Sequence, residues 1–202
     1  MFEKLRKRLS GKESKRRQLA ALLMLVGSGL GLLASFVLSI ESLTLAKNSH
    51  AVLNCDLNAT MSCSAVANHW SAAPLGFPSS FIGMMTLPVM VTIAVALLAG
   101  AKFPKWFMRA AQLGAVAGLL FASWMFYMSY VEIGALCPWC LTLDAGMLLI
   151  FYGLTRHNIL NKIIEHRGLR RFVDQGYDTL VLASVAALII MAILAKFGSQ
   201  II

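Results

Sequence analysis

Leu136-Cys137-Pro138-Trp139-Cys140 places two cysteines, with two residues between them, at the start of an apolar segment. Two such thiols can close a small disulfide ring and reopen it by thiol–disulfide exchange. The unpaired N–H groups and the dipole of a first helical turn favour a thiolate there. Pro138 suits that turn because its missing N–H costs nothing at this position. The stretch therefore predicts a redox-active dithiol at the beginning of a helix.

Apolar blocks on both sides of this stretch predict an all-α integral membrane protein. Of the 202 residues, 58% are apolar and 13% are charged, which is more apolar surface than a soluble domain of this size buries. A helix needs about 20 apolar residues to span a bilayer. Five blocks approach that length, at residues 19–40, 79–101, 110–131, 141–155 and 179–195. The fourth block is short, so its helix is expected to begin at Pro138 or Trp139.

The blocks divide the chain into four predicted segments. These are a basic cytoplasmic tail at residues 1–18, a four-helix transmembrane bundle at 19–155 that includes an outer loop at 41–78, a basic cytoplasmic loop at 156–178, and a fifth transmembrane helix with an outer stub at 179–202. The outer loop is long for a structureless connection, so we expect it to be ordered or functional. Its residues 59–70 permit a short helix.

The distribution of the +9 net charge predicts the orientation of the chain in a membrane. Sixteen of the 18 lysines and arginines lie in three segments, at residues 1–17, 102–109 and 156–171. The positive-inside rule places these segments, and the N-terminus, in the cytoplasm, with the C-terminus outside. The basic N-terminal run is also expected to touch anionic membrane lipid. We expect no nucleic-acid partner, because no aromatic platform or binding fold accompanies this charge.

The predicted topology puts all four cysteines, Cys55, Cys63, Cys137 and Cys140, at the outer face, where disulfides are expected. Four cysteines allow three pairings. The local one joins Cys55 to Cys63 and Cys137 to Cys140, and a swap to Cys63–Cys137 would pass oxidising equivalents between loop and helix. Inert structural disulfides and a four-thiol zinc site are the alternatives. We expect no metal, because the compartment is oxidising and no histidine has helpful spacing.

Two groups of residues resemble the vitamin K epoxide reductase family, particularly its bacterial branch. The first resembles the family's pattern of Cys-Asp, Ser-Cys-Ser-x-Val and Gly-x-Pro followed by Gly, and comprises Cys55-Asp56, Ser62-Cys63-Ser64-Ala65-Val66, Gly76-Phe77-Pro78 and Gly83. The second is Cys137-Pro138-Trp139-Cys140 at the head of the fourth span. The order of spans and loops agrees over residues 19–155. The resemblance implies a four-helix bundle around a quinone site, with the fifth helix added at its periphery.

The resemblance also implies a membrane thiol:quinone oxidoreductase in the cell's inner (plasma) membrane. Electrons would pass from a thioredoxin-fold thiol oxidase outside the cytoplasm to Cys55 and Cys63, then to Cys137 and Cys140, and on to ubiquinone or menaquinone. This activity would support disulfide-bond formation and need neither a metal nor a flavin. One alternative is a vitamin K quinone or epoxide reductase that uses the same relay. The other is a non-catalytic membrane protein with structural disulfides.

Four residues are the predicted contacts of the quinone: Ser79, Phe81, Trp139 and Asp144. In the family, the positions of Ser79 and Asp144 often carry Asn and an aromatic residue and are associated with hydrogen bonds to quinone oxygens. Both positions remain polar here, although the departures weaken the expectation of epoxide chemistry. Phe81 and Trp139 would wall the pocket, although helix packing and interfacial anchoring explain them equally well. His69 is a candidate general base for Cys63 or Cys137.

Overall fold

The chain folds into helices in a computed structural model that describes residues 2–201, except 49, 50, 54, 57 and 59. In chain order the helices are α1 (Phe2–Lys47), α2 (Cys63–Ala67), the 3-10 turn η1 (Trp70–Ala72), α3 (Ser80–Leu98), α4 (Lys105–Tyr127), the π-helix η2 (Met128–Ile133), α5 (Pro138–Leu160), α6 (Arg167–Gln175) and α7 (Tyr177–Ile201). The extended pairing within the described residues is a single two-residue parallel bridge. Residues 1 and 202, in the first and last predicted segments, lie outside the described residues.

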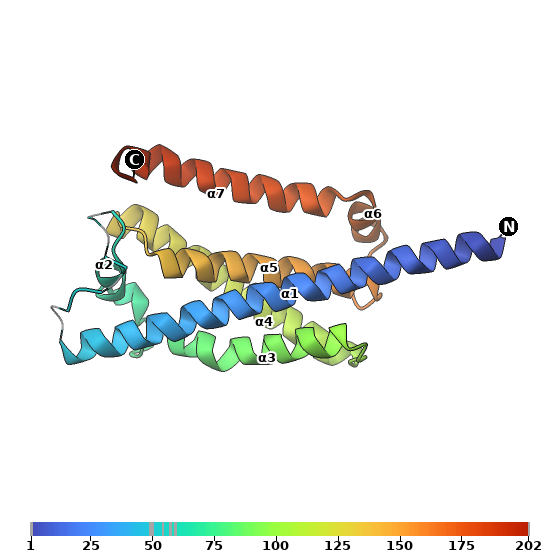
Figure 1. The fold of residues 1–202 in the computed structure, drawn as a ribbon, viewed down its shortest axis with the longest axis horizontal. Coiled ribbons are helices and arrows are strands. Elements are labelled where there is room, and N and C mark those ends of the chain that lie inside the picture. The colour runs from blue at the N-terminus through green and yellow to red at the C-terminus, as the bar shows by residue number, and fades with distance from the viewer. Residues whose placement is uncertain (1, 49–50, 54, 57, 59, 202) are drawn as a thin grey trace.

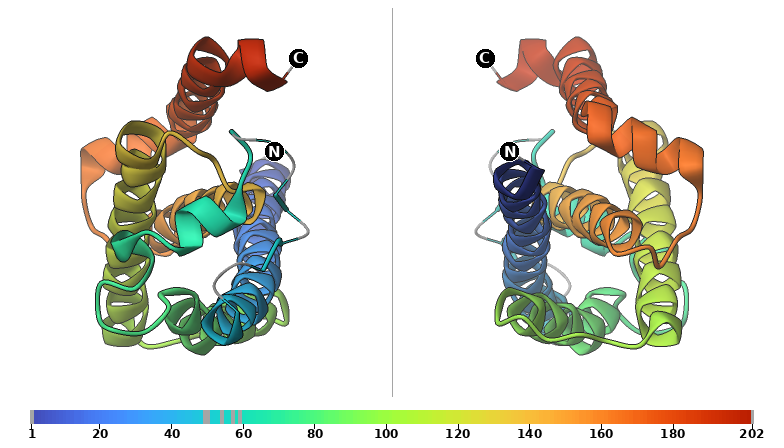
Figure 2. Two further views of the ribbon diagram at one scale, coloured as in Figure 1. Left: turned by 90° about the vertical axis from the view of Figure 1, so that its left-hand side faces the viewer. Right: turned by 90° about the vertical axis from the view of Figure 1, so that its right-hand side faces the viewer.

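Four long helices, α1, α3, α4 and α5, run lengthwise beside one another, and α7 lies outside them (Figures 1 and 2). Figure 1 shows α2 and the C-terminus at one end of the molecule and α6 at the other. The end with α2 is called the sulfur end below, and the end with α6 is called the basic end. Helices able to cross a membrane by length and composition cover Glu13–Lys47, Ser80–Leu98, Lys105–Ile133, Pro138–Leu160 and Tyr177–Gly198. The predicted all-α membrane architecture with five spans is confirmed.

Helix α1 ends at Lys47, so the loop predicted at residues 41–78 is corrected at its start. Glu41 is helical because the apolar pattern continues past it, and Leu45 is buried in the cluster around the cysteines. Within this extension, Ser42 donates its hydroxyl hydrogen to the Leu38 carbonyl oxygen, at 2.8 Å. The predicted tail is also helical from Phe2 onward. Helix α5 begins at Pro138, as predicted, because proline is favoured at this position.

Glycines allow α1 and α5 to touch along their backbones. A Cβ atom at Gly27 would lie 2.6 Å from the carbonyl oxygen of Gly146, and one at Gly146 would lie 2.6 Å from that of Gly27. A Cβ atom at Gly153 would lie 2.6 Å from the carbonyl oxygen of Ala20. The hydrophobic effect does not drive helices together inside a membrane. Van der Waals contact at such close approach stabilises their association instead. This contact fixes the helix that carries Cys137 and Cys140 against α1.

The fifth span is held to the bundle near both of its ends. Towards the basic end, Arg156 of α5 forms a buried ion pair with Asp178, at 3.3 Å between Nη1 and Oδ2. Towards the sulfur end, the Tyr130 hydroxyl donates to the carbonyl oxygen of Ala192, at 3.2 Å. Between these attachments lies a largely apolar cavity of about 840 Å³, lined by residues of α4, α5, α6 and α7.

Replacing Gly27 with alanine should destabilise the folded protein by about 1–3 kcal/mol, because the added methyl group overpacks a backbone contact. Gly29→Ala is the matched control, since a Cβ atom there meets nothing within 4 Å. Alanine is also the better helix former, so the control should unfold at the same temperature as the parent chain or slightly above it. Thermal unfolding in detergent measures both variants. Equal losses of stability in the two would contradict the close α1–α5 contact.

Candidate functional site

A short backbone bridge aligns the cysteine loop with the start of α5. The N–H of Leu136 donates to the carbonyl oxygen of Thr60 at 2.7 Å, and the N–H of Ser62 donates to the carbonyl oxygen of Leu136 at 3.0 Å. Met61 and Leu136 therefore form a parallel bridge. Cys137 directly follows Leu136 in the bridge, and Cys63 follows Met61 after one intervening residue. Two chain segments more than 70 residues apart thus deliver their sulfurs to one place.

The sulfurs of the loop and of the helix lie within exchange distance. Cys55 and Cys63 form a disulfide, and Cys137 and Cys140 are free thiols. The Sγ atoms of Cys137 and Cys63 are 3.3 Å apart, with the Cys137 thiol donating to the disulfide sulfur. Both side chains are only 1% exposed, in an apolar cluster with Leu45, Leu53 and Val66. The geometry permits Cys137 to attack or release Cys63 without competition from water.

Cys137 is the N-terminal cap of α5, and its sulfur accepts the hydrogen bond that a hydroxyl or carboxylate normally takes. The backbone N–H of Cys140 donates to Cys137 Sγ at 3.3 Å. Hydrogen bonding from the Cys140 thiol, joined by the N–H groups of Cys140 and Trp139, lowers the pKa of Cys137 below its ordinary value, although burial opposes this. Thiolate is the reactive form in exchange, so the cap prepares Cys137 as a nucleophile and as a leaving group.

Asp56 holds the loop that carries the disulfide. Its Oδ1 accepts hydrogen bonds from the Ser62 hydroxyl at 2.9 Å and the Ser64 N–H at 3.0 Å, and its Oδ2 accepts one from the Leu53 N–H at 2.9 Å. Burial by itself would raise the pKa of Asp56, but these hydrogen bonds outweigh it and lower the pKa below the usual value. The ionised carboxylate therefore ties together the residues that flank Cys55 and Cys63.

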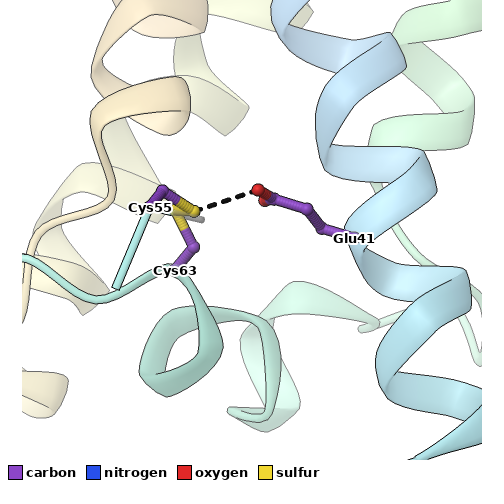
Figure 3. A group of neighbouring side chains, drawn as sticks. All are labelled: Glu41, Cys55 and Cys63. Carbon is purple, nitrogen blue, oxygen red and sulfur yellow. Dashed lines mark hydrogen bonds between the residues drawn. A yellow bond between two sulfur atoms is a disulfide. The ribbon is translucent and has the colours of Figure 1, made fainter. Parts of the chain in front are cut away.

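Glu41, which the sequence did not indicate as a site residue, is a buried carboxyl group beside the disulfide. Its Oε1 lies 3.0 Å from Cys55 Sγ, and Figure 3 shows the side chain reaching from α1 toward the two cysteines. Candidate ligand atoms of Glu41, Cys55 and Cys63 lie within 4.8 Å of one another, but both sulfurs are spent in the disulfide and offer no thiolate to a metal. The available signal was a lone acid at the end of an apolar span.

The four predicted quinone contacts lie in three places. Trp139 packs against the apolar cluster of the cysteines, and Asp144 lines the cavity between the bundle and α7. Ser79 occupies the N-cap position of α3 without a side-chain cap hydrogen bond, and Phe81 lies in the first turn of that helix; neither lines that cavity. The buried serine at this end of α3 is Ser80, whose hydroxyl accepts a hydrogen bond from that of Ser39.

His69, the predicted base, caps the turn η1 instead of contacting a sulfur. Its Nδ1 lies 2.8 Å from the hydroxyl of Ser71 and accepts from the N–H of that residue at 3.4 Å. These two contacts fix the ring within its own loop.

A family model described as the Vitamin K epoxide reductase family matches residues 22–155 of the sequence. The match covers more than half of the chain and includes all four cysteines. The chain belongs to the vitamin K epoxide reductase family. A search of curated proteins found no match. Members of this family are membrane oxidoreductases that use quinones and generally work with thioredoxin-like partners, so this vitamin K epoxide reductase family member is a multi-pass membrane oxidoreductase.

Replacing Asp56 with asparagine should loosen the loop by about 1–3 kcal/mol, because one acceptor oxygen of a charged hydrogen-bonding group is lost. Hydrogen exchange at the Ser64 amide, which donates to Asp56, measures the effect. Because the folded-state pKa of Asp56 is lowered, its contribution is complete above the unfolded-state pKa and is lost as the pH falls through the folded-state value.

Protection of the Ser64 amide in the parent chain should therefore decline in that acidic range, after correction for intrinsic exchange. The Asp56→Asn variant should show lower protection with no such decline. Equal protection in the two chains at neutral pH would contradict the role assigned to Asp56.

Proposed function

We propose that this protein is a membrane thiol:quinone oxidoreductase that supports disulfide-bond formation outside the cytoplasm. Electrons pass from the dithiol of a thioredoxin-fold oxidase to Cys55 and Cys63, then to Cys137 and Cys140, and on to a quinone. The observation that carries the proposal is the 3.3 Å separation of the Cys63 and Cys137 sulfurs, with one pair oxidised and the other reduced. This redox state is the one expected directly after the loop has passed its electrons to the helix.

The internal transfer consists of two exchanges. In the first, the Cys63 thiolate attacks Cys137 of the oxidised helix pair, which forms a Cys63–Cys137 disulfide and releases Cys140 as a thiolate. In the second, the Cys55 thiolate attacks Cys63, which closes the loop disulfide and releases Cys137. Two electrons have then moved from the loop pair to the helix pair. The hydrogen bonds that lower the pKa of Cys137 favour this second release.

The helix pair is suited to pass its electrons to a quinone held beside α5. Such a quinone accepts two electrons and two protons. Asp144 follows Cys140 by one helical turn, about 6 Å along the axis, and is an acid lining the apolar cavity of about 840 Å³. Asp144 is the contact that this cavity supports, whereas Trp139, which packs against the cysteine cluster, remains a prediction. Ser79 and Phe81 remain predictions, as does the choice between ubiquinone and menaquinone.

We propose an inner-membrane location, and the arrangement of charge supports an orientation with the N-terminus in the cytoplasm. Ion pairs between Arg16 and Asp174, at 3.0 Å, and between Lys105 and Glu165, at 2.7 Å, lie at the basic end. The four cysteines lie at the sulfur end, where Figure 1 also places the C-terminus. If the basic end faces the cytoplasm, the disulfide and the partner's dithiol share the oxidising compartment.

The Cys140→Ala variant should keep its fold and its loop disulfide but lose quinone reduction, because the last sulfur of the relay is gone. Quinol formation is followed by absorbance after a dithiol substrate is added, with ubiquinone and menaquinone analogues in parallel. Cys140 is the second cysteine of a short ring that contributes little stability, so unfolding should be nearly unchanged. Undiminished turnover would contradict the assignment, and turnover of the epoxide by the parent chain would favour the vitamin K alternative.

Removing Cys55 and Cys140 together should trap the exchange intermediate. Cys63 and Cys137 are then the remaining thiols, with their sulfurs already 3.3 Å apart, and mild oxidation should join them nearly completely. Mass spectrometry of the digested protein identifies the linkage. The matched control lacks Cys55 and Cys137 and leaves Cys63 with Cys140. If the control forms its cross-link as readily as the first variant, the proposed route through Cys137 is wrong.

A further inference from the structure

Glu41 is a buried carboxyl group beside the loop disulfide, and the exchange of sulfur bonds described above gives it no role. We propose that Glu41 is the proton acceptor and donor for Cys55, taking its proton when the loop disulfide closes and returning it when the disulfide opens. Because this inference rests on the proposed thiol oxidoreductase function, its test includes a reaction that needs no quinone.

The position of Glu41 favours a direct proton transfer. Glu41 is 9% exposed and projects from α1, and its Oε1 lies 3.0 Å from Cys55 Sγ. Its other oxygen, Oε2, is buried and has no hydrogen-bond partner within the described part of the chain. The disulfide sulfur is therefore the partner the structure gives this carboxyl group (Figure 3).

The redox state of Cys55 determines which group carries the proton. A disulfide sulfur has no hydrogen, so a hydrogen bond over this 3.0 Å separation requires the proton to be on Glu41. When the disulfide is open, Cys55 carries a thiol hydrogen that it can donate to the Glu41 carboxylate along the same line. One proton thus fits between the two atoms in both redox states, which is the geometry of a general acid–base.

The surroundings of Glu41 supply acids and thiols, and none of the ion pairs between described residues includes it. Its electrostatic neighbours are Asp56 of the loop and Cys137 and Cys140 at the start of α5. Each of these groups is neutral or negative. A buried carboxylate without a cation is costly, so holding a proton relieves the cost while the disulfide is closed.

The proton balances in both half-reactions. When the loop closes, the Cys55 thiol passes its proton to the Glu41 carboxylate and attacks Cys63; the Cys55–Cys63 bond forms, the Cys63–Cys137 bond breaks, and Cys137 leaves with the electron pair. When the partner reduces the loop, the partner's first thiolate attacks Cys55, and Cys63 leaves. The partner's second thiolate then attacks the partner sulfur that is bonded to Cys55. The partner's disulfide forms, and Cys55 leaves as a thiolate that takes the proton from Glu41.

The two sulfurs of the disulfide therefore have separate roles. Cys63 faces Cys137, at 3.3 Å, and exchanges with it, whereas Cys55 faces Glu41, at 3.0 Å, and exchanges protons with it. Because Cys63 faces Cys137, we assign the partner's attack to Cys55, which has the Glu41 acid beside it when it later leaves the partner's sulfur.

Reduction of the loop disulfide by dithiothreitol in the full-length protein tests this inference without a quinone. Samples are quenched with an alkylating reagent, and the release of Cys55 from its mixed disulfide with dithiothreitol, the step that uses the Glu41 proton, is followed by mass spectrometry at several pH values. The rate constant for this release is divided by the fraction of bound dithiothreitol whose second thiol is ionised. For the parent chain this normalised rate should fall as the pH rises, because Glu41 loses the proton that it donates to Cys55.

The Glu41→Gln variant should be slower by roughly a hundredfold at low pH, the low end of the usual contribution of a positioned acid. Its normalised rate should not change with pH. Glu41→Asp restores an acid at a greater distance, so it should be slower than the parent and keep the fall with pH. Glu132→Gln is the control; Glu132 is an exposed acid of η2 near the sulfur end, and its variant should match the parent.

A parent-like rate and pH profile in Glu41→Gln would overturn the role of Glu41, while quinone reduction by the parent chain would leave the proposed function intact. Failure of the parent chain to reduce quinone would instead overturn the function, whatever the dithiothreitol rates. If Glu41→Gln does not fold, Glu41→Asp decides: a slower rate supports the proposal, and an unchanged rate overturns it.

Discussion

The chemistry of this protein depends on two hydrogen bonds made by the backbone of Leu136. They pair it with Thr60 and Ser62, and so fix where the loop lies against the first turn of α5. A shift of one residue in this bridge would turn Cys63 away from Cys137, because neighbouring side chains of an extended segment point to opposite sides. The packing of Leu45 and Val66 against the sulfurs then seals the arrangement. A backbone register therefore sets the sulfur–sulfur distance.

The burial of the cysteines limits which thiols can reach the disulfide. Cys63 and Cys137 are 1% exposed and Cys55 is 6% exposed, so thiols in solution reach the disulfide slowly, and at Cys55 rather than at Cys63. A partner protein has to displace part of the loop before its dithiol can reach Cys55. The hydrogen bonds of Asp56 resist that displacement, and Asp56 thereby links the stability of the loop to the ease with which electrons enter. The close α1–α5 contact keeps the helix pair in place meanwhile.

The sequence predicted the parts of this structure that depend on composition and local pattern. Blocks of apolar residues located the five spans, and Pro138 located the start of α5. The end of α1 was missed because the charge of Glu41 resembles a boundary, whereas the burial of Leu45 by distant residues continues the helix. The contact between Glu41 and Cys55 depends on the same tertiary packing. The separation of Ser79 from the cavity that Asp144 lines likewise follows from helix orientation, which no local pattern records.

The capping role of Cys137 has a consequence for the helix that it starts. A reduced Cys137 can ionise to a thiolate, which attracts the N–H of Cys140, whereas a sulfur bonded to a second sulfur cannot carry that charge. The first turn of α5 is then held less firmly in the oxidised protein than in the reduced one. The stability of the backbone at Trp139 and Cys140 thus depends on the redox state of the cysteine pair, and it is lower when the pair is oxidised.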